Sequence, residues 1–207
     1  MRNWFHLNGQ KIMNLFLVFF LGRFAFKQRW EKWKEGRFDL LEATFVAQNL
    51  VALSAIVVRE EHKAIDSRIW PQCVALAAFF SGAGFIQTED APPILTRAAR
   101  WVTFFALLIG ILAFISLGRS FGILVAGRRV QTGGLYRFIR HPMYLSDLIW
   151  RIGYLLNNAC KQNVVLFFFS SGCYMYRAVL EERFLREDPA YEAYCKQVHY
   201  RFIPGIW

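Results

Sequence analysis

The sequence predicts an all-α, polytopic helical membrane protein with about five or six transmembrane helices. Of its 207 residues, 56% are hydrophobic and 17% aromatic, while only 19% are charged, below the roughly one quarter typical of soluble domains. Several apolar runs approach the roughly 20 residues that a bilayer-spanning helix needs. The net charge is +10, and its Lys and Arg residues flank these runs, as in loops at a membrane edge. That distribution argues against a nucleic-acid partner.

Six apolar segments are the candidate helices, because a chain in hydrocarbon must satisfy its backbone amides within each helix. The first, 12–26, is short, contains Arg23, and is followed by a basic, Trp-rich stretch at 27–37 that is typical of an interfacial helix or loop. No small-residue cleavage site follows it, so we expect no signal peptide. The other segments are Leu40–Val58, 70–86, 101–117, 144–157 and 164–180.

The positions of the basic loops do not decide whether the chain crosses the membrane five or six times. Three candidate spans separate the loop at 27–37 from the basic connection at 118–141. If all three cross, the two loops lie on opposite sides, and both cannot follow the positive-inside tendency. We take the second loop as cytosolic.

The chain is organised around residues 133–144, which read Gly-Gly-Leu-Tyr-Arg-Phe-Ile-Arg-His-Pro-Met-Tyr. This first polar cluster leads into the fifth apolar segment. A second polar cluster, at 177–182, lies at the end of the sixth apolar segment. The polar stretch 157–162 separates these two segments. We therefore expect a helical hairpin that brings both polar clusters to the same membrane edge.

The first cluster has the chemistry of a ligand site. Pro142 predicts a helix start directly after His141. The His141 imidazole and the Tyr144 phenol can donate hydrogen bonds to a carboxylate or a ribose, and a helix start offers unpaired amides to an anion. Gly133 and Gly134 fit either a close backbone approach to a ligand or a plain loop that enters a helix.

The second cluster allows two interpretations. Arg177 and Glu181 are four residues apart and share a helix face, so they can form an intrahelical ion pair. Alternatively, they are functional charges at the end of a membrane helix beside a cavity. Asp147 and Arg151 pose the same choice inside the fifth segment. There, either a mutual salt bridge or a substrate pocket reshaped by Asp147 explains the two charges.

The Arg-His-Pro-x-Tyr run at 140–144, the Glu-Glu pair after an apolar helix, and the tail residues Tyr191, Tyr194 and 202–204 resemble the isoprenylcysteine carboxyl methyltransferase family. The resemblance extends to the related phospholipid methyltransferase family of integral-membrane methyltransferases. It implies a one-domain organisation, with N-terminal transmembrane helices at 1–117 and a C-terminal catalytic region at 118–207. Asp147 departs from the family pattern, in which a glycine commonly lies at or near this position.

The resemblance also implies an activity: transfer of a methyl group from S-adenosyl-L-methionine to a lipophilic acceptor, a carboxylate of the isoprenylcysteine type. The active site would face the cytosol of a multi-pass membrane protein. Arg177, as a substrate-orienting group, and His141 would be catalytic. Tyr191, Tyr194 and 202–204 would cap the cofactor site, although an interfacial aromatic belt explains the tyrosines equally well. The implied cofactor-binding residues are Arg128, Arg129, Val130, Gln131, Tyr136, His141, Pro142, Met143, Tyr144, Glu181 and Glu182.

Two other functions remain open at this point. One is an NADPH-dependent membrane reductase related to the sterol reductases, and the other is a non-catalytic membrane scaffold. The expected partners are a lipophilic small molecule or a lipidated substrate, together with membrane lipids. The four cysteines lie far apart, without metal-ligand spacing, so we expect no metal site. The sequence identifies neither the acceptor nor the oligomeric state.

Overall fold

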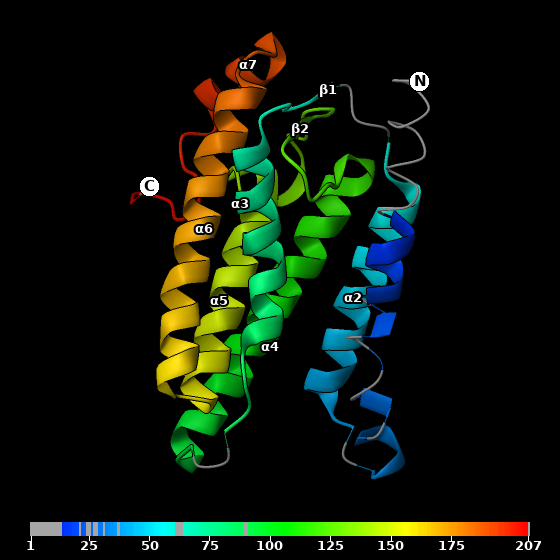
Figure 1. Cartoon of the computed structure of the whole chain (residues 1–207), viewed down its shortest axis with the longest axis vertical. Coiled ribbons are helices and arrows are strands. Elements are labelled where there is room, and N and C mark those ends of the chain that lie inside the picture. Colours follow the sequence, from blue (N-terminus) through cyan, green and yellow to red (C-terminus); the bar gives the residue numbers. More distant parts are fainter. Residues whose placement is uncertain are drawn as a thin grey trace.

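The computed structural model describes residues 14–20, 22–23, 26, 29–30, 32–36, 38–60, 64–88 and 91–206. Its elements form an elongated helical bundle (Figure 1). The α-helices are α2 (Leu40–Val58), α3 (Ile69–Phe80), α4 (Pro93–Leu117), α5 (Pro142–Asn157), α6 (Lys161–Leu185) and α7 (Pro189–Gln197). Short 3-10 turns cover Ser81–Gly84, Gly118–Ser120 and Gly134–Arg137, and the two-residue strands are β1 (Ala64–Ile65) and β2 (Ala126–Gly127). The predicted helical fold class is confirmed.

The helices pack in a fixed order across the bundle. α4 packs against α2 and α5, while α6 packs against α5 and α3. β1 and β2 pair antiparallel, Ala64 with Gly127 and Ile65 with Ala126. They lie at the same end of the bundle as α7 (Figure 1). This end also receives the start of α5 and the end of α6, and we call it the site end.

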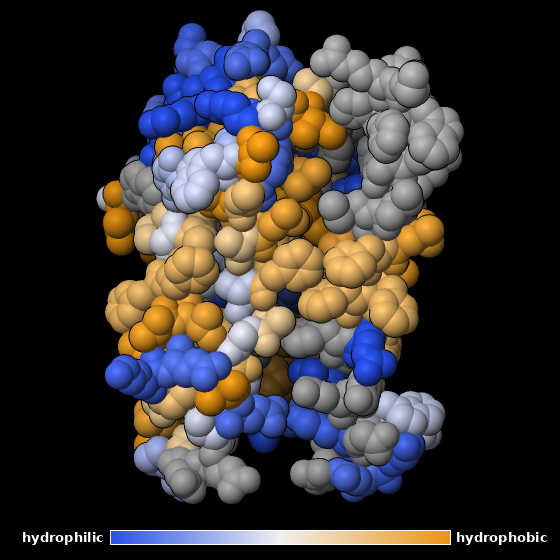
Figure 2. Space-filling model, viewed as in Figure 1, coloured by the Kyte–Doolittle hydropathy of each residue, from blue (hydrophilic) through white to orange (hydrophobic). Residues whose placement is uncertain are grey.

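Three of the described helices are long and apolar enough to cross a membrane: Leu40–Val58, Pro93–Ser120 and Lys161–Leu185. The apolar helix Ile69–Gly84 is shorter, and α5 has 16 residues. The predicted first span at 12–26 and the basic stretch at 27–37 lie partly outside the described residues. Figure 2 shows hydrophobic side chains over the middle of the bundle and hydrophilic ones gathered toward its two ends. This distribution fits a membrane protein, while the number of crossings stays a prediction.

The predicted hairpin is confirmed, and Asn163 fastens its turn. Asn163 is fully buried near the start of α6. Its Nδ2 donates to the carbonyl oxygens of Asn158 (2.7 Å) and Ile86 (2.8 Å), and its Oδ1 accepts from the Ile86 amide (3.0 Å). One side chain therefore joins the α5–α6 turn to the segment after α3, which sets how far the two helices reach toward the site end.

Gly134 is required by the turn that precedes the site. Its φ is +56°, and a Cβ there would lie 2.0 Å from the Ser116 Oγ on α4. The neighbouring Gly133 has φ −93°, and a Cβ there would meet no atom within 4 Å. Neither glycine is among the residues that line the polar cavity described below. A turn and a close helix contact therefore explain Gly134.

This difference gives a matched pair of substitutions. Gly134→Ala should destabilise the protein by roughly 1–3 kcal/mol, because it combines a strained φ with a clash against Ser116. Gly133→Ala should have little effect. Thermal unfolding of both variants in detergent, followed by circular dichroism, tests the expectation. Equal melting temperatures for the two variants would contradict it.

Candidate functional site

The hairpin brings the two predicted polar clusters together at the site end. His141 caps the start of α5, and Glu182 lies in the last turn of α6. The Glu182 carboxylate accepts hydrogen bonds from Arg140 Nη1 (2.8 Å) and Arg201 Nε (3.1 Å), and it lies 3.1 Å from His141 Nε2. Glu182 is only 2% exposed. Such a carboxylate is stable when buried because several cationic or donor groups surround it.

The chain's tail completes this network. The backbone amides of Arg140 and His141 donate to the carbonyl oxygens of Tyr200 and Arg201, each at 2.9 Å. Arg140 Nη2 also donates to the His199 carbonyl (2.6 Å). Residues 199–201 are therefore held along the segment that enters α5, and they supply Arg201 to Glu182.

Glu181, one residue earlier, faces a different environment. Its carboxylate accepts a hydrogen bond from the Tyr144 hydroxyl and lies 4.0 Å from Arg128 Nη1. Arg128 also donates to the Ser120 and Leu124 carbonyls. Burial of the Arg128 guanidinium lowers its pKa, and the Glu181 charge opposes that shift. Arg128 lies directly over Gly122, where a Cβ would come within 2.2 Å of the guanidinium.

Glu181 and Arg128 lie in the wall of a cavity of about 90 Å³ at the site end, which we call the polar cavity. All of the predicted cofactor residues line it except Pro142 and Glu182. Pro142 is fully buried at the first position of α5, and Glu182 is occupied by its ion-pair network. The lining residues are Leu117, Ser120, Gly122, Ala126, Arg128, Arg129, Val130, Gln131, Tyr136, Arg140, His141, Met143, Tyr144, Glu181, Leu185, Tyr191 and Tyr194.

Three tyrosines close the polar cavity on the side of the tail. Tyr191 and Tyr194 lie on α7, with ring centroids 5.7 Å apart, and the Tyr194 hydroxyl donates to the Tyr136 carbonyl (2.7 Å). Burial raises the pKa of Tyr136, Tyr191 and Tyr194 above the ordinary tyrosine value, so all three stay neutral. Phe202 packs elsewhere, in a cluster with Tyr144 and Tyr174.

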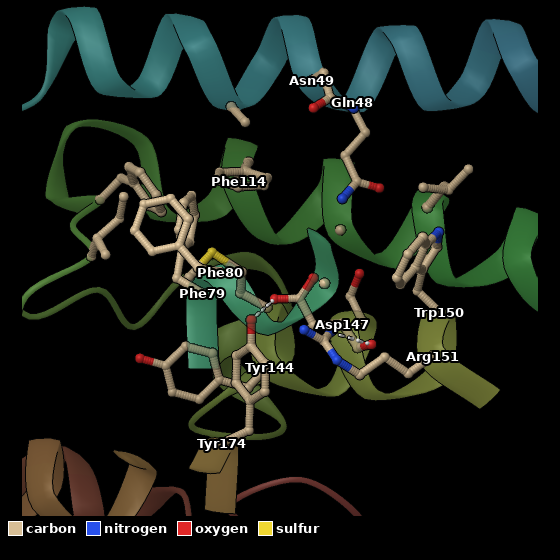
Figure 3. A pocket seen from close by; sticks show the side chains of 18 of the residues that line it. Gln48, Asn49, Phe79, Phe80, Phe114, Tyr144, Asp147, Trp150, Arg151 and Tyr174 are labelled. Atoms are coloured by element: carbon tan, nitrogen blue, oxygen red, sulfur yellow. Dashed lines mark hydrogen bonds between the residues drawn. The ribbon is translucent and has the colours of Figure 1, made fainter. Parts of the chain in front are cut away.

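A second cavity, of about 160 Å³, lies among α2, α3, α4, α5 and α6 (Figure 3), and we call it the apolar cavity. Gly122, Met143 and Tyr144 line both cavities. The two spaces therefore meet at the start of α5. The apolar side chains that line the apolar cavity are Phe20, Phe45, Ala52, Phe79, Phe80, Ala83, Leu107, Phe114, Phe121, Ile123, Met143 and Trp150.

Arg177 lies where the two cavities meet, and it does not form the intrahelical pair with Glu181 that the sequence allows. It is 2% exposed and lines the apolar cavity. Its Nη2 donates to the Ile123 carbonyl at 2.6 Å, and its guanidinium carbon lies 4.8 Å from the centre of the Tyr144 ring. The partners of Glu181 are instead Tyr144 and Arg128. The ion-pair interpretation is therefore wrong.

The salt bridge between Asp147 and Arg151, one of the two alternatives that the sequence leaves open, is also not formed. Arg151 Nη1 donates to the backbone carbonyl of Asp147 (3.1 Å), and its other nitrogens bind Ser170 Oγ and Ser81 Oγ, each at 3.1 Å. The Asp147 carboxylate accepts instead from the Tyr174 hydroxyl (2.8 Å). The Arg151 side chain runs toward α3 and α6, so the carboxylate remains in the cavity wall.

Comparisons with known proteins show a similarity over the region that carries this site. The model of the phospholipid methyltransferase family matches residues 101–191, which include both polar clusters. Residues 101–191 are therefore similar to that family. The predicted resemblance is thus confirmed for the part of the chain that carries the candidate site.

Similar proteins extend the comparison to two kinds of membrane enzyme. The probable protein-S-isoprenylcysteine O-methyltransferases of Oryza sativa subsp. indica and subsp. japonica are each 34% identical over 101 residues, which cover 42% of this chain and 50% of theirs. The Delta(14)-sterol reductase TM7SF2 of Mus musculus is 31% identical over 87 residues, which cover 39% of this chain and 20% of the reductase. The chain thus spans half the length of the rice relatives.

Sequence reasoning missed most of the wall formed by residues 120–128, since it identified only Arg128 there. Gln72 on α3 holds this loop, because its Nε2 donates to the Val125 carbonyl (3.1 Å) and its Oε1 accepts from the Val125 amide (3.0 Å). A polar residue within an apolar segment was the available signal. Among the described residues, no group of three His, Cys, Asp or Glu side chains could hold a metal ion.

Proposed function

We propose that this protein is an integral-membrane methyltransferase that uses S-adenosyl-L-methionine and methylates a lipophilic acceptor. One observation carries the proposal: a polar cavity with both charge signs and an apolar cavity share Gly122, Met143 and Tyr144. A polar cofactor and an apolar acceptor could then meet at that junction. The family match at 101–191 supports the reaction class.

The residues of the polar cavity suit this cofactor. The Glu181 carboxylate can accept hydrogen bonds from ribose hydroxyls or from the ammonium of the amino-acid end, while Arg128 and Arg129 can bind its carboxylate. The rings of Tyr191 and Tyr194 offer apolar surface for adenine. When bound, S-adenosyl-L-methionine supplies a methyl group on a positively charged sulfur, which leaves as a neutral thioether.

The chain's own contribution would be positioning and exclusion of water. Tyr144 is oriented by its hydrogen bond to Glu181 and stacks on His141 with ring centroids 5.2 Å apart. In this proposal Arg177 orients the acceptor from the apolar side. A carboxylate acceptor of the isoprenylcysteine type would be ionised at neutral pH and would need no general base. Its oxygen would form the new bond to the methyl carbon as the carbon–sulfur bond breaks. The site end would face the cytosol.

The similarity to the mouse Delta(14)-sterol reductase favours one alternative, a membrane reductase that uses NADPH. The two functions differ in the ligand of the polar cavity. A non-catalytic scaffold would bind neither ligand. Calorimetric titration of the detergent-purified protein with S-adenosylhomocysteine and, separately, with NADPH therefore discriminates among the three.

We expect saturable binding of S-adenosylhomocysteine and none of NADPH. His141→Ala should weaken that binding about tenfold, because it removes a ring that lines the cavity and orients Tyr144. Incubating the protein with radiolabelled S-adenosyl-L-methionine and N-acetyl-S-farnesylcysteine then tests the acceptor class. Binding of NADPH alone would replace the proposal with the reductase. Cofactor binding without methyl transfer to N-acetyl-S-farnesylcysteine would contradict only the proposal that the acceptor is of the isoprenylcysteine type.

A further inference from the structure

Two polar side chains in the wall of the apolar cavity have no role in the proposed methyl transfer. Asp147 on α5 and Gln48 on α2 both line the cavity. In Figure 3 the Gln48 side chain extends from α2 into the cavity, toward the side that carries Asp147 and Arg151. An amide and a carboxylate in such apolar surroundings are costly unless they find hydrogen-bond partners.

The Asp147 carboxylate has acceptor capacity to spare. Among the described residues, Tyr174 is its one hydrogen-bond donor, at 2.8 Å from Oδ2. A carboxylate has about four lone-pair sites. The nearby Arg151 does not use them, because its nitrogens donate to Ser170, Ser81 and two backbone carbonyls and its guanidinium carbon lies 4.8 Å from the centre of the Tyr174 ring.

The Gln48 amide also has an acceptor oxygen that no described residue uses. Its Oε1 is buried and accepts no hydrogen bond from any described residue. The amide packs on Gly110 of α4, where a Cβ would lie 2.9 Å from Gln48 Cδ and 3.0 Å from Nε2. Gly110 thus makes room for the amide inside the bundle. A buried acceptor without a donor destabilises the protein, and a ligand that supplies the donor would recover that loss.

Both groups can accept a further hydrogen bond: Gln48 Oε1 has no donor, and Asp147 has only Tyr174 among the described residues. We infer that the apolar cavity binds an acceptor whose apolar body carries an O–H or N–H group, held between Asp147 and Gln48. The inference rests on the proposed function, since it describes the methyl acceptor. Asp147 lies three residues beyond Tyr144, about 4.5 Å further along the helix axis. The donor group would therefore lie a few bonds from the methylated atom, deeper in the bundle.

Three probes with the same 12-carbon chain isolate the donor: 1-dodecanol, with a neutral O–H; dodecylamine, with a cationic N–H; and 1-methoxydodecane, with an oxygen but no donor. Each is titrated calorimetrically into the full-length protein in detergent. We expect wild type to bind at least one donor probe about tenfold more tightly than 1-methoxydodecane, as one hydrogen bond to a charged group predicts. Asp147→Leu and Gln48→Leu should bring that ratio close to one.

The ratio within each variant is the decisive measurement, because a lower folded fraction changes the affinities of all probes together. Asp147→Asn keeps an acceptor oxygen but removes the charge, so a preference for dodecanol should persist in it and one for dodecylamine should fall. Gln197→Leu, at the exposed end of α7, is the matched control and should keep the wild-type ratio.

Equal binding of all three probes by wild type, or an unchanged ratio in Asp147→Leu, would overturn the inference. S-adenosylhomocysteine is titrated into the same samples to separate this outcome from a failure of the proposed function. Normal cofactor binding with no donor preference removes the acceptor inference alone. No cofactor binding by a folded wild type removes the methyltransferase proposal instead.

Discussion

Replacing Glu181 by Gln is expected to weaken the binding of S-adenosylhomocysteine about a hundredfold, the equivalent of two charge-assisted hydrogen bonds. Glu181 is the carboxylate of the polar cavity, and it is positioned by the Tyr144 hydroxyl. Gln keeps the size of the side chain and an oxygen for Tyr144. It removes the charge that would bind the ligand's hydroxyls or ammonium. The loss should therefore appear in ligand affinity, with little change in stability.

Calorimetric titration measures the affinity, and circular dichroism on the same sample verifies the fold. Glu187→Gln, an exposed carboxylate two residues after the end of α6, is the matched control and should bind like wild type. If Glu181→Gln bound S-adenosylhomocysteine normally, Glu181 would lose its assigned role. If it failed to fold, the carboxylate would be structural.

The sequence predicts the hairpin because its signals are local. Pro142 starts α5, a polar stretch breaks the apolar run, and α6 begins at Lys161, within that stretch. The prediction that both polar clusters share one end follows from this geometry. It is confirmed by the contacts of Glu182 with His141 and Arg140. The family resemblance, and not local reasoning, implied most residues of the polar cavity, which cluster at 128–131 and 136–144.

Contacts between distant parts of the chain were not predictable in this way. Adjacent residues on a helix point about 100° apart, so the Glu-Glu pair does not reveal which glutamate faces a ligand. The structure separates them: Glu181 faces the cavity and Glu182 faces Arg140 and Arg201. The ion pair of Arg177 with Glu181, one of the two interpretations that the sequence allows, is not formed for a related reason. Spacing of four residues permits the pair, but Arg177 instead binds the carbonyls of the 120–128 loop.

Glu182→Ala is expected to cause the largest loss of stability, about 3–5 kcal/mol, because it leaves the buried Arg140 guanidinium without its counter-charge and His141 without its hydrogen-bond partner. Arg140 is 9% exposed and His141 7%, and both bind Glu182. Arg201 joins them from the tail. Without the carboxylate, the tail should separate from the segment that enters α5, and the polar cavity would lose one of its walls. Unfolding in detergent, followed by circular dichroism, measures the free-energy change.

Glu192→Ala on α7 is the control, since its ion pair with Arg186 is exposed (3.6 Å) and should contribute less than about 1 kcal/mol. Comparing Glu182→Ala with Glu181→Gln then separates the two neighbouring glutamates. The first should lower stability, and with it ligand binding, whereas the second should lower binding alone. A Glu182→Ala protein as stable as wild type would mean that Arg140 and Arg201 find other partners. The network would then not be what holds the tail against α5.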